Sequence, residues 1–66
     1  MEYRKIGAVI RTLRQEQNMT QKQLADKMNI SDKTVSKWER GQGLPDISLM
    51  PELTAILGVE MVNLLS

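Results

Sequence analysis

The sequence predicts an all-α fold of five helices, compact, with a helix-turn-helix at about residues 21–40. Apolar residues recur along the chain at the spacing of one helix face. No stretch alternates with period two over the length of a strand. At 66 residues the chain is expected to form one domain, 1–66, with one thin core.

The first two helices are predicted from apolar spacing and from a capping pattern. The apolar face of the first comprises Ile6, Val9, Ile10 and Leu13, and residues 17–19 end it. Thr20 and Gln23 have the spacing of a capping box, so a short second helix is predicted over 21–28. Asn29 then tolerates the left-handed conformation of a helix end.

The third helix is predicted from Ser31, a suitable N-cap, to about Arg40, with Gly41 following its end. Asp32 suits the positive end of the helix dipole. A fourth helix is expected to begin with Ser48 as N-cap, which places Pro51 in the first turn, and to end at Gly58. Residues 59–65 are predicted to form a fifth helix that closes the core.

Composition excludes several classes of function. The chain contains neither Cys nor His, which excludes a disulfide framework, a thiol nucleophile and a zinc finger. The acids are scattered over predicted helix surfaces, so no catalytic pair is expected and the chain is predicted not to be an enzyme. No cofactor or metal is expected. Apolar runs are too short to cross a membrane, and the cytoplasm is the expected location.

The net charge of +1 averages two unlike regions. Residues 1–42 carry all nine Lys and Arg and five of the eight acids, a net of +4, whereas residues 43–66 carry three acids and no base. Such asymmetry indicates an anionic partner for the first region.

Residues 21–40 have the spacing of a helix-turn-helix. Two helices that cross closely need a small residue and a turn residue, here Ala25 and Asn29. At about 100° per residue, one arc of the third helix holds polar and cationic side chains, while the other holds apolar anchors. The polar arc consists of Asp32, Lys33, Ser36, Lys37 and Arg40. Such a helix suits the major groove, where donors meet guanine N7 and O6.

The stretch 30–41, ISDKTVSKWERG, resembles the recognition helix of lambda-repressor-like regulators of the Cro and Xre type. Further matching motifs run from about Tyr3 to Leu65: Ile6-Gly7, Leu13-Arg14, Thr20-Gln21, Leu24-Ala25, residues 44–49, Leu57-Gly58-Val59 and Leu64-Leu65. The resemblance implies a transcriptional regulator, expected to be a repressor, that binds a palindromic operator in double-stranded DNA as a homodimer.

The resemblance also implies roles for individual residues. Gln21 would contact a phosphate, and Arg40 would return to the DNA backbone. Base-reading or groove positions would be those of Ser31, Asp32, Lys33, Ser36 and Lys37. Arg14 and Glu39 match an ion pair that joins the first helix to the end of the recognition helix.

Three departures from the family pattern change these expectations. The loop 41–46 contains no base and includes Asp46, so fewer phosphate contacts are expected from it. Asp32 stands where a donor is common; its carboxylate can accept from cytosine N4, repel phosphate or act only on the helix dipole. Glu60 stands where Ser or Thr often caps the last helix.

The same residues also permit other interpretations. Lys33 and Lys37 can be an ordinary solvated face, and Gln21 an ordinary exposed side chain, whereas Trp38 is expected in the core. The competing function is a protein-interaction or antitoxin-type module with secondary DNA binding, indicated by apolar residues of the last third: Met50, Ile56, Met61, Val62 and Leu65. The domain is either the whole protein or the N-terminal domain of a longer regulator.

Overall fold

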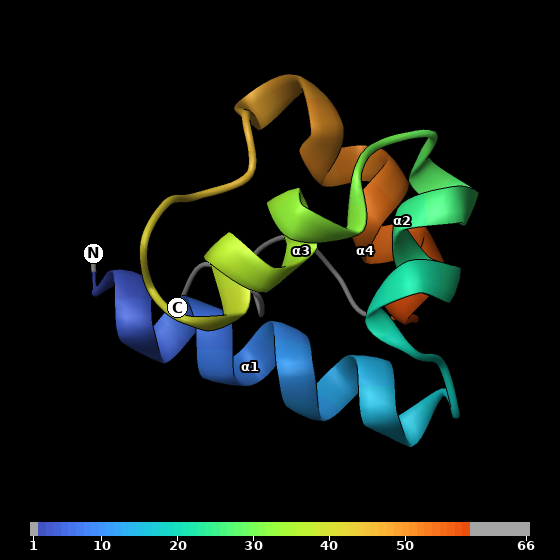
Figure 1. Cartoon of the computed structure of the whole chain (residues 1–66), viewed down its shortest axis with the longest axis horizontal. Coiled ribbons are helices and arrows are strands. Elements are labelled where there is room, and N and C mark those ends of the chain that lie inside the picture. Colours follow the sequence, from blue (N-terminus) through green and yellow to red (C-terminus); the bar gives the residue numbers. More distant parts are fainter. Residues whose placement is uncertain (1, 59–66) are drawn as a thin grey trace.

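The computed structural model describes residues 2–58, and all regular structure within them is helical. These residues form four α-helices: α1 (Tyr3–Glu16), α2 (Gln21–Met28), α3 (Asp32–Glu39) and α4 (Met50–Leu57). A 3-10 turn, η1 (Ile47–Leu49), precedes α4. Figure 1 shows α3 lying over the long α1, with α2 and α4 beside it. The predicted fifth helix lies outside the described residues.

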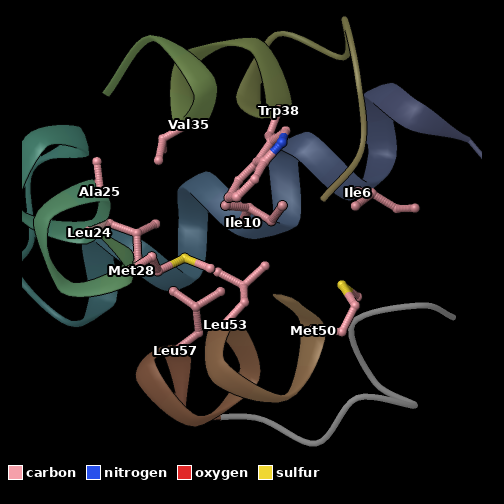
Figure 2. Packing of buried hydrophobic residues seen from close by; sticks show 10 residues of the cluster. All are labelled: Ile6, Ile10, Leu24, Ala25, Met28, Val35, Trp38, Met50, Leu53 and Leu57. Atoms are coloured by element: carbon pink, nitrogen blue, oxygen red, sulfur yellow. The ribbon is translucent and has the colours of Figure 1, made fainter. Parts of the chain in front are cut away.

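One apolar core joins the four α-helices. Figure 2 shows its ten buried side chains, which are Ile6, Ile10, Leu24, Ala25, Met28, Val35, Trp38, Met50, Leu53 and Leu57. Every helix contributes, so none of these short helices depends on its own hydrogen bonds alone. Trp38 is 4% exposed, which confirms its predicted place in the core.

The predicted helix boundaries around the helix-turn-helix are confirmed. The Thr20 hydroxyl accepts a hydrogen bond from the Gln23 amide at 3.0 Å, and the Gln23 side chain accepts from the Thr20 amide at 2.8 Å. Asn29 is left-handed with φ of 58°, and Ser31 caps α3. Gly41 and Gly58 follow α3 and α4 with φ of 73° and 75°.

The predicted start of the fourth helix is wrong. Ser48 is not the N-cap of α4, because its amide and hydroxyl are hydrogen-bonded to Asp46 instead. The Asp46 carboxylate accepts from the Ser48 amide at 3.0 Å and from the Ser48 hydroxyl at 2.6 Å. Asp46 is thus the N-cap of η1. The helix α4 then begins at Met50 without a side-chain cap, and Pro51 lies in its first turn, where its missing N–H leaves no donor unpaired.

Gly7 sets how closely α1 approaches the end of α3. A Cβ at Gly7 would lie 2.2 Å from the Trp38 carbonyl oxygen and 3.0 Å from that of Glu39. No larger residue fits without displacing backbone. This contact brings the charged groups of α1 within reach of Glu39.

Over residues 2–58, no helix has both the length and the apolar character that crossing a membrane requires.

Candidate nucleic-acid interface

The turn between α2 and α3 is fixed by its own hydrogen bonds. The Asn29 amide donates to the Asp26 carbonyl at 3.2 Å, and the Ile30 amide donates to the Ala25 carbonyl at 3.0 Å. Ala25 is 1% exposed at the crossing, where its small side chain permits close approach. The helix-turn-helix predicted at 21–40 is therefore present, with α3 held firmly against α2.

The outer face of α3 agrees with the predicted polar arc. Asp32, Lys33 and Lys37 are exposed, whereas Ser36 is half-buried. Arg40 directly follows the helix and is exposed, with its Nε donating to the Ser36 carbonyl at 3.3 Å. The side-chain ammonium groups of these two lysines have no hydrogen-bond or ion-pair partner in the part of the chain that the structure describes.

Two further predicted site residues, Ser31 and Gln21, also have internal partners. The Ser31 hydroxyl accepts a hydrogen bond from the Lys33 amide at 3.1 Å, so Ser31 caps α3. Gln21 is half-buried, and its Nε2 donates to Glu39 Oε1 at 3.1 Å. Gln21 is therefore not the ordinary exposed side chain that was the alternative to a phosphate contact.

The ion pair implied between Arg14 and Glu39 is present and buried. Arg14 Nε lies 2.7 Å from Glu39 Oε2, and Arg14 Nη2 lies 3.0 Å from Oε1. The Glu39 side chain is 0% exposed, and that of Arg14 10%. Arg14 Nη1 also donates to the Met19 carbonyl at 2.7 Å, so one guanidinium joins α1, α3 and the turn before α2.

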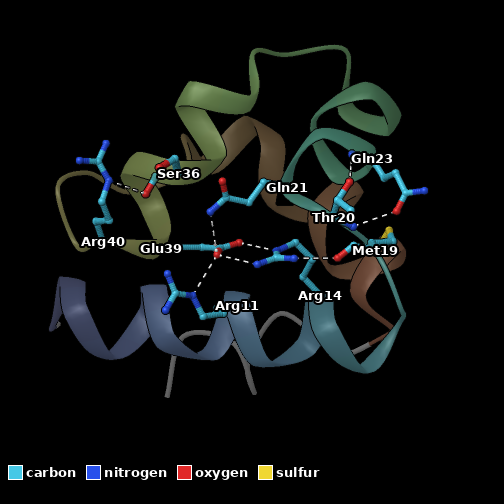
Figure 3. Close-up of polar contacts among 9 residues, drawn as sticks. All are labelled: Arg11, Arg14, Met19, Thr20, Gln21, Gln23, Ser36, Glu39 and Arg40. Atoms are coloured by element: carbon cyan, nitrogen blue, oxygen red, sulfur yellow. Dashed lines mark hydrogen bonds and ion pairs between the residues drawn. The ribbon is translucent and has the colours of Figure 1, made fainter.

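Glu39 of α3 accepts hydrogen bonds from side chains of two other helices, α1 and α2, as Figure 3 shows. In addition to Arg14, its Oε1 accepts from Gln21 and from Arg11 Nε, the latter at 3.2 Å. We refer to Arg11, Arg14, Gln21 and Glu39 as the Glu39 cluster. Neither the Arg11 contact nor the Gln21 contact was predicted.

Burial and hydrogen bonding act in opposite directions on Glu39. Burial alone would raise the pKa of its carboxyl, but hydrogen bonds from Arg14, Gln21 and Arg11 outweigh it and hold that pKa below its ordinary value. The hydrogen bond to Glu39 likewise raises the pKa of Arg14. Both groups are therefore charged at neutral pH, and the buried charges are compensated.

The loop after α3 adds an acid rather than a base. Hydrogen bonds from the hydroxyl and the amide of Ser48 lower the pKa of the Asp46 carboxyl, which is fully exposed. Loop residues 41–46 carry no cation, so they offer no positively charged side chain to an anion near this end of α3.

Within residues 2–58, no three His, Cys, Asp or Glu side chains lie together so that they could hold a metal ion.

Two curated relatives are similar to this chain over most of this chain's length. It is 36% identical over 56 residues to multiprotein-bridging factor 1 of Candida albicans, covering 85% of this chain and 37% of that protein. It is 35% identical over 57 residues to the HTH-type transcriptional activator BcrR of Enterococcus faecalis, covering 86% of this chain and 28% of that protein. The chain thus spans about a third of the length of these relatives.

The structure of the restriction-modification controller protein C.AhdI from Aeromonas hydrophila superposes with a TM-score of 0.85 at 27% identity, covering 94% of each chain. The sequence also matches the helix-turn-helix family over residues 10–64. The chain therefore belongs to the Cro/C1-type helix-turn-helix family of DNA-binding transcriptional regulators.

Proposed function

We propose that residues 1–66 act as one DNA-binding domain that reads a specific duplex sequence by placing α3 in the major groove. The observation that carries this proposal is the exposure of Lys33 and Lys37 on one face of α3, while Trp38 and Glu39 fix the opposite face. Exposed donors on a rigid helix are what base-edge recognition requires.

Within this proposal the outer face of α3 divides into two kinds of contact. Lys33 and Lys37 donate to guanine N7 and O6, Ser36 contacts a base edge, and Asp32 accepts from cytosine N4. Arg40 contacts a phosphate beyond the end of the helix. Ser31, the N-cap of α3, lies at the edge of the groove, and Gln21, the first residue of α2, contacts a phosphate of the DNA.

We further propose that two copies bind a palindromic operator in the cytoplasm and repress transcription, with no catalytic activity. A single domain without a basic loop after α3 offers few phosphate contacts, so two domains on adjacent half-sites would supply useful affinity. The similarity to a transcriptional activator makes the sign of regulation the first property to test.

The test is selection of binding sites from random duplex DNA, followed by affinity measurements with Lys33→Ala and Lys37→Ala. If these lysines read bases, each substitution costs about 1–3 kcal/mol on the selected site and relaxes preference at one position. Unchanged affinity and preference in both variants would reject the assignment. The spacing of half-sites in the selected DNA shows whether two copies bind together. Sedimentation shows whether the dimer forms without DNA, and a promoter fusion shows whether transcription is repressed or activated.

A second candidate is a protein-binding module, favoured by the name of the multiprotein-bridging relative and by a shallow apolar groove on α1. The groove is lined by Lys5, Ala8, Val9, Thr12 and Leu13. Met50, one residue first considered for this role, is buried in the core instead. If the site selection returns no enriched sequence, this candidate replaces the first.

A further inference from the structure

The two arginines of the Glu39 cluster are used very differently. All three guanidinium nitrogens of Arg14 donate to protein acceptors, and its side chain is 10% exposed. Only Nε of Arg11 donates, to Glu39 Oε1, and its side chain is 52% exposed. Among the contacts of residues 2–58, both terminal nitrogens of Arg11 are therefore without an acceptor.

The cluster does not need Arg11 for charge balance. Arg14 alone neutralises Glu39, and both carboxylate oxygens already accept from it. Arg11 therefore adds one positive charge to a neutral buried pair, and this charge lies at the surface. A surplus guanidinium with free donors matches the bidentate geometry of a phosphate group.

Gln21 places a second donor beside this charge. Its Nε2 and Arg11 Nε donate to the same oxygen, Glu39 Oε1, at 3.1 and 3.2 Å. An amide nitrogen has two hydrogens, and only one is used here. Figure 3 shows the two side chains arriving at Glu39 from α2 and α1, next to the end of α3 that carries Arg40.

We propose that Arg11 binds the same backbone phosphate of duplex DNA that is assigned above to Gln21, with Glu39 as the positioning residue that holds the two donors side by side. This inference rests on the proposed function. It assigns to α1 the contact that the uncharged and acidic residues of loop 41–46 do not provide. In this arrangement each donor keeps its bond to Glu39 and offers its remaining hydrogens to the phosphate.

The test measures affinity for the selected duplex over a salt series in Arg11→Gln, Arg11→Lys and Lys5→Gln. Lys5 is the matched control: it is an exposed cation of α1 that lines the apolar groove rather than the Glu39 cluster. Removing one phosphate contact reduces the slope of log affinity against log salt by about 0.9. The loss of affinity between about 50 and about 200 mM salt then becomes about threefold smaller.

Arg11→Gln is expected to show this reduced slope with unchanged sequence preference, because a phosphate contact carries no base information. Arg11→Lys and Lys5→Gln are expected to keep the wild-type slope. If Arg11→Gln keeps the wild-type slope, the inference is overturned while specific DNA binding stands. The same holds if Arg11→Lys or Lys5→Gln reduces the slope as much as Arg11→Gln does. A wild type that selects no sequence overturns the proposed function and this inference together.

Discussion

The inner and outer faces of α3 both carry charge, but they differ in what surrounds it. Glu39 on the inner face is fully buried and accepts four hydrogen bonds from three side chains. Lys33 and Lys37 on the outer face are exposed and unpaired within residues 2–58. Charge with internal partners therefore fixes the position of the helix, whereas charge without them is available to a ligand.

The largest expected effect comes from breaking the inner face. Glu39→Ala leaves Arg14 buried without its partner, and such a loss destabilises a fold by about 3–5 kcal/mol. Urea unfolding at neutral pH measures it. Asp32→Ala, which removes an exposed acid of the same helix, should cost less than about 1 kcal/mol. Equal losses in the two variants would show that burial of Glu39 does not distinguish the faces.

Lowering the pH should remove the contribution of the Glu39 carboxylate to the free energy of unfolding. The pKa of Glu39 is lower in the folded than in the unfolded chain, so its contribution to stability is fully present above its ordinary value of 4.5. The contribution is lost as the pH falls through the lowered pKa. The difference in unfolding free energy between wild type and Glu39→Gln should therefore shrink from about pH 6 to about pH 3. A constant difference over this range would contradict the assignment of the acid loss to Glu39.

A side chain at position 7 should strain the contact between α1 and α3, because there is no space for it. Gly7→Ala places a Cβ against the Trp38 carbonyl and is expected to destabilise by about 1–3 kcal/mol, although alanine favours helices. Thermal unfolding measures the change. Gly43→Ala is the control, since a Cβ there meets no atom within 4 Å. Stabilisation by Gly7→Ala would mean that the two helices separate easily.

The smallest expected effect on stability lies on the outer face. Lys33→Ala and Lys37→Ala should each change the free energy of unfolding by less than about 0.5 kcal/mol, because neither lysine supports the core. Measured by the same urea titration, a larger loss would show that these lysines have a structural role. In that case the residues of α3 that stabilise the fold and the residues that bind DNA would not be two separate sets.

Local signals in the sequence predicted most of the fold. The capping box at Thr20, the left-handed Asn29 and the periodicity of α3 each depend on neighbours within four residues, and all are present. The start of α4 was missed because two such signals compete: Asp46 and Ser48 both suit a helix start, and the carboxylate accepts from the hydroxyl.

The candidate site was less predictable than the helices that carry it. The exposed arc of α3 follows from helical geometry alone, but its role in reading DNA remains a prediction. The meeting of Arg11 and Gln21 at Glu39 depends on the angles between three helices and on long side chains separated by up to 28 residues. Neither residue spacing nor residue type contains that information.

The fluorescence of Trp38 reports on folding without an added label. It is the only tryptophan, and it lies in the core at the contact of α3 with α1. Its indole should emit at short wavelength in the folded chain and at longer wavelength once unfolding exposes it to water. A DNA duplex on the outer face of α3 would not reach the ring. Emission that changes with urea but not with operator would therefore follow folding and binding separately in one sample.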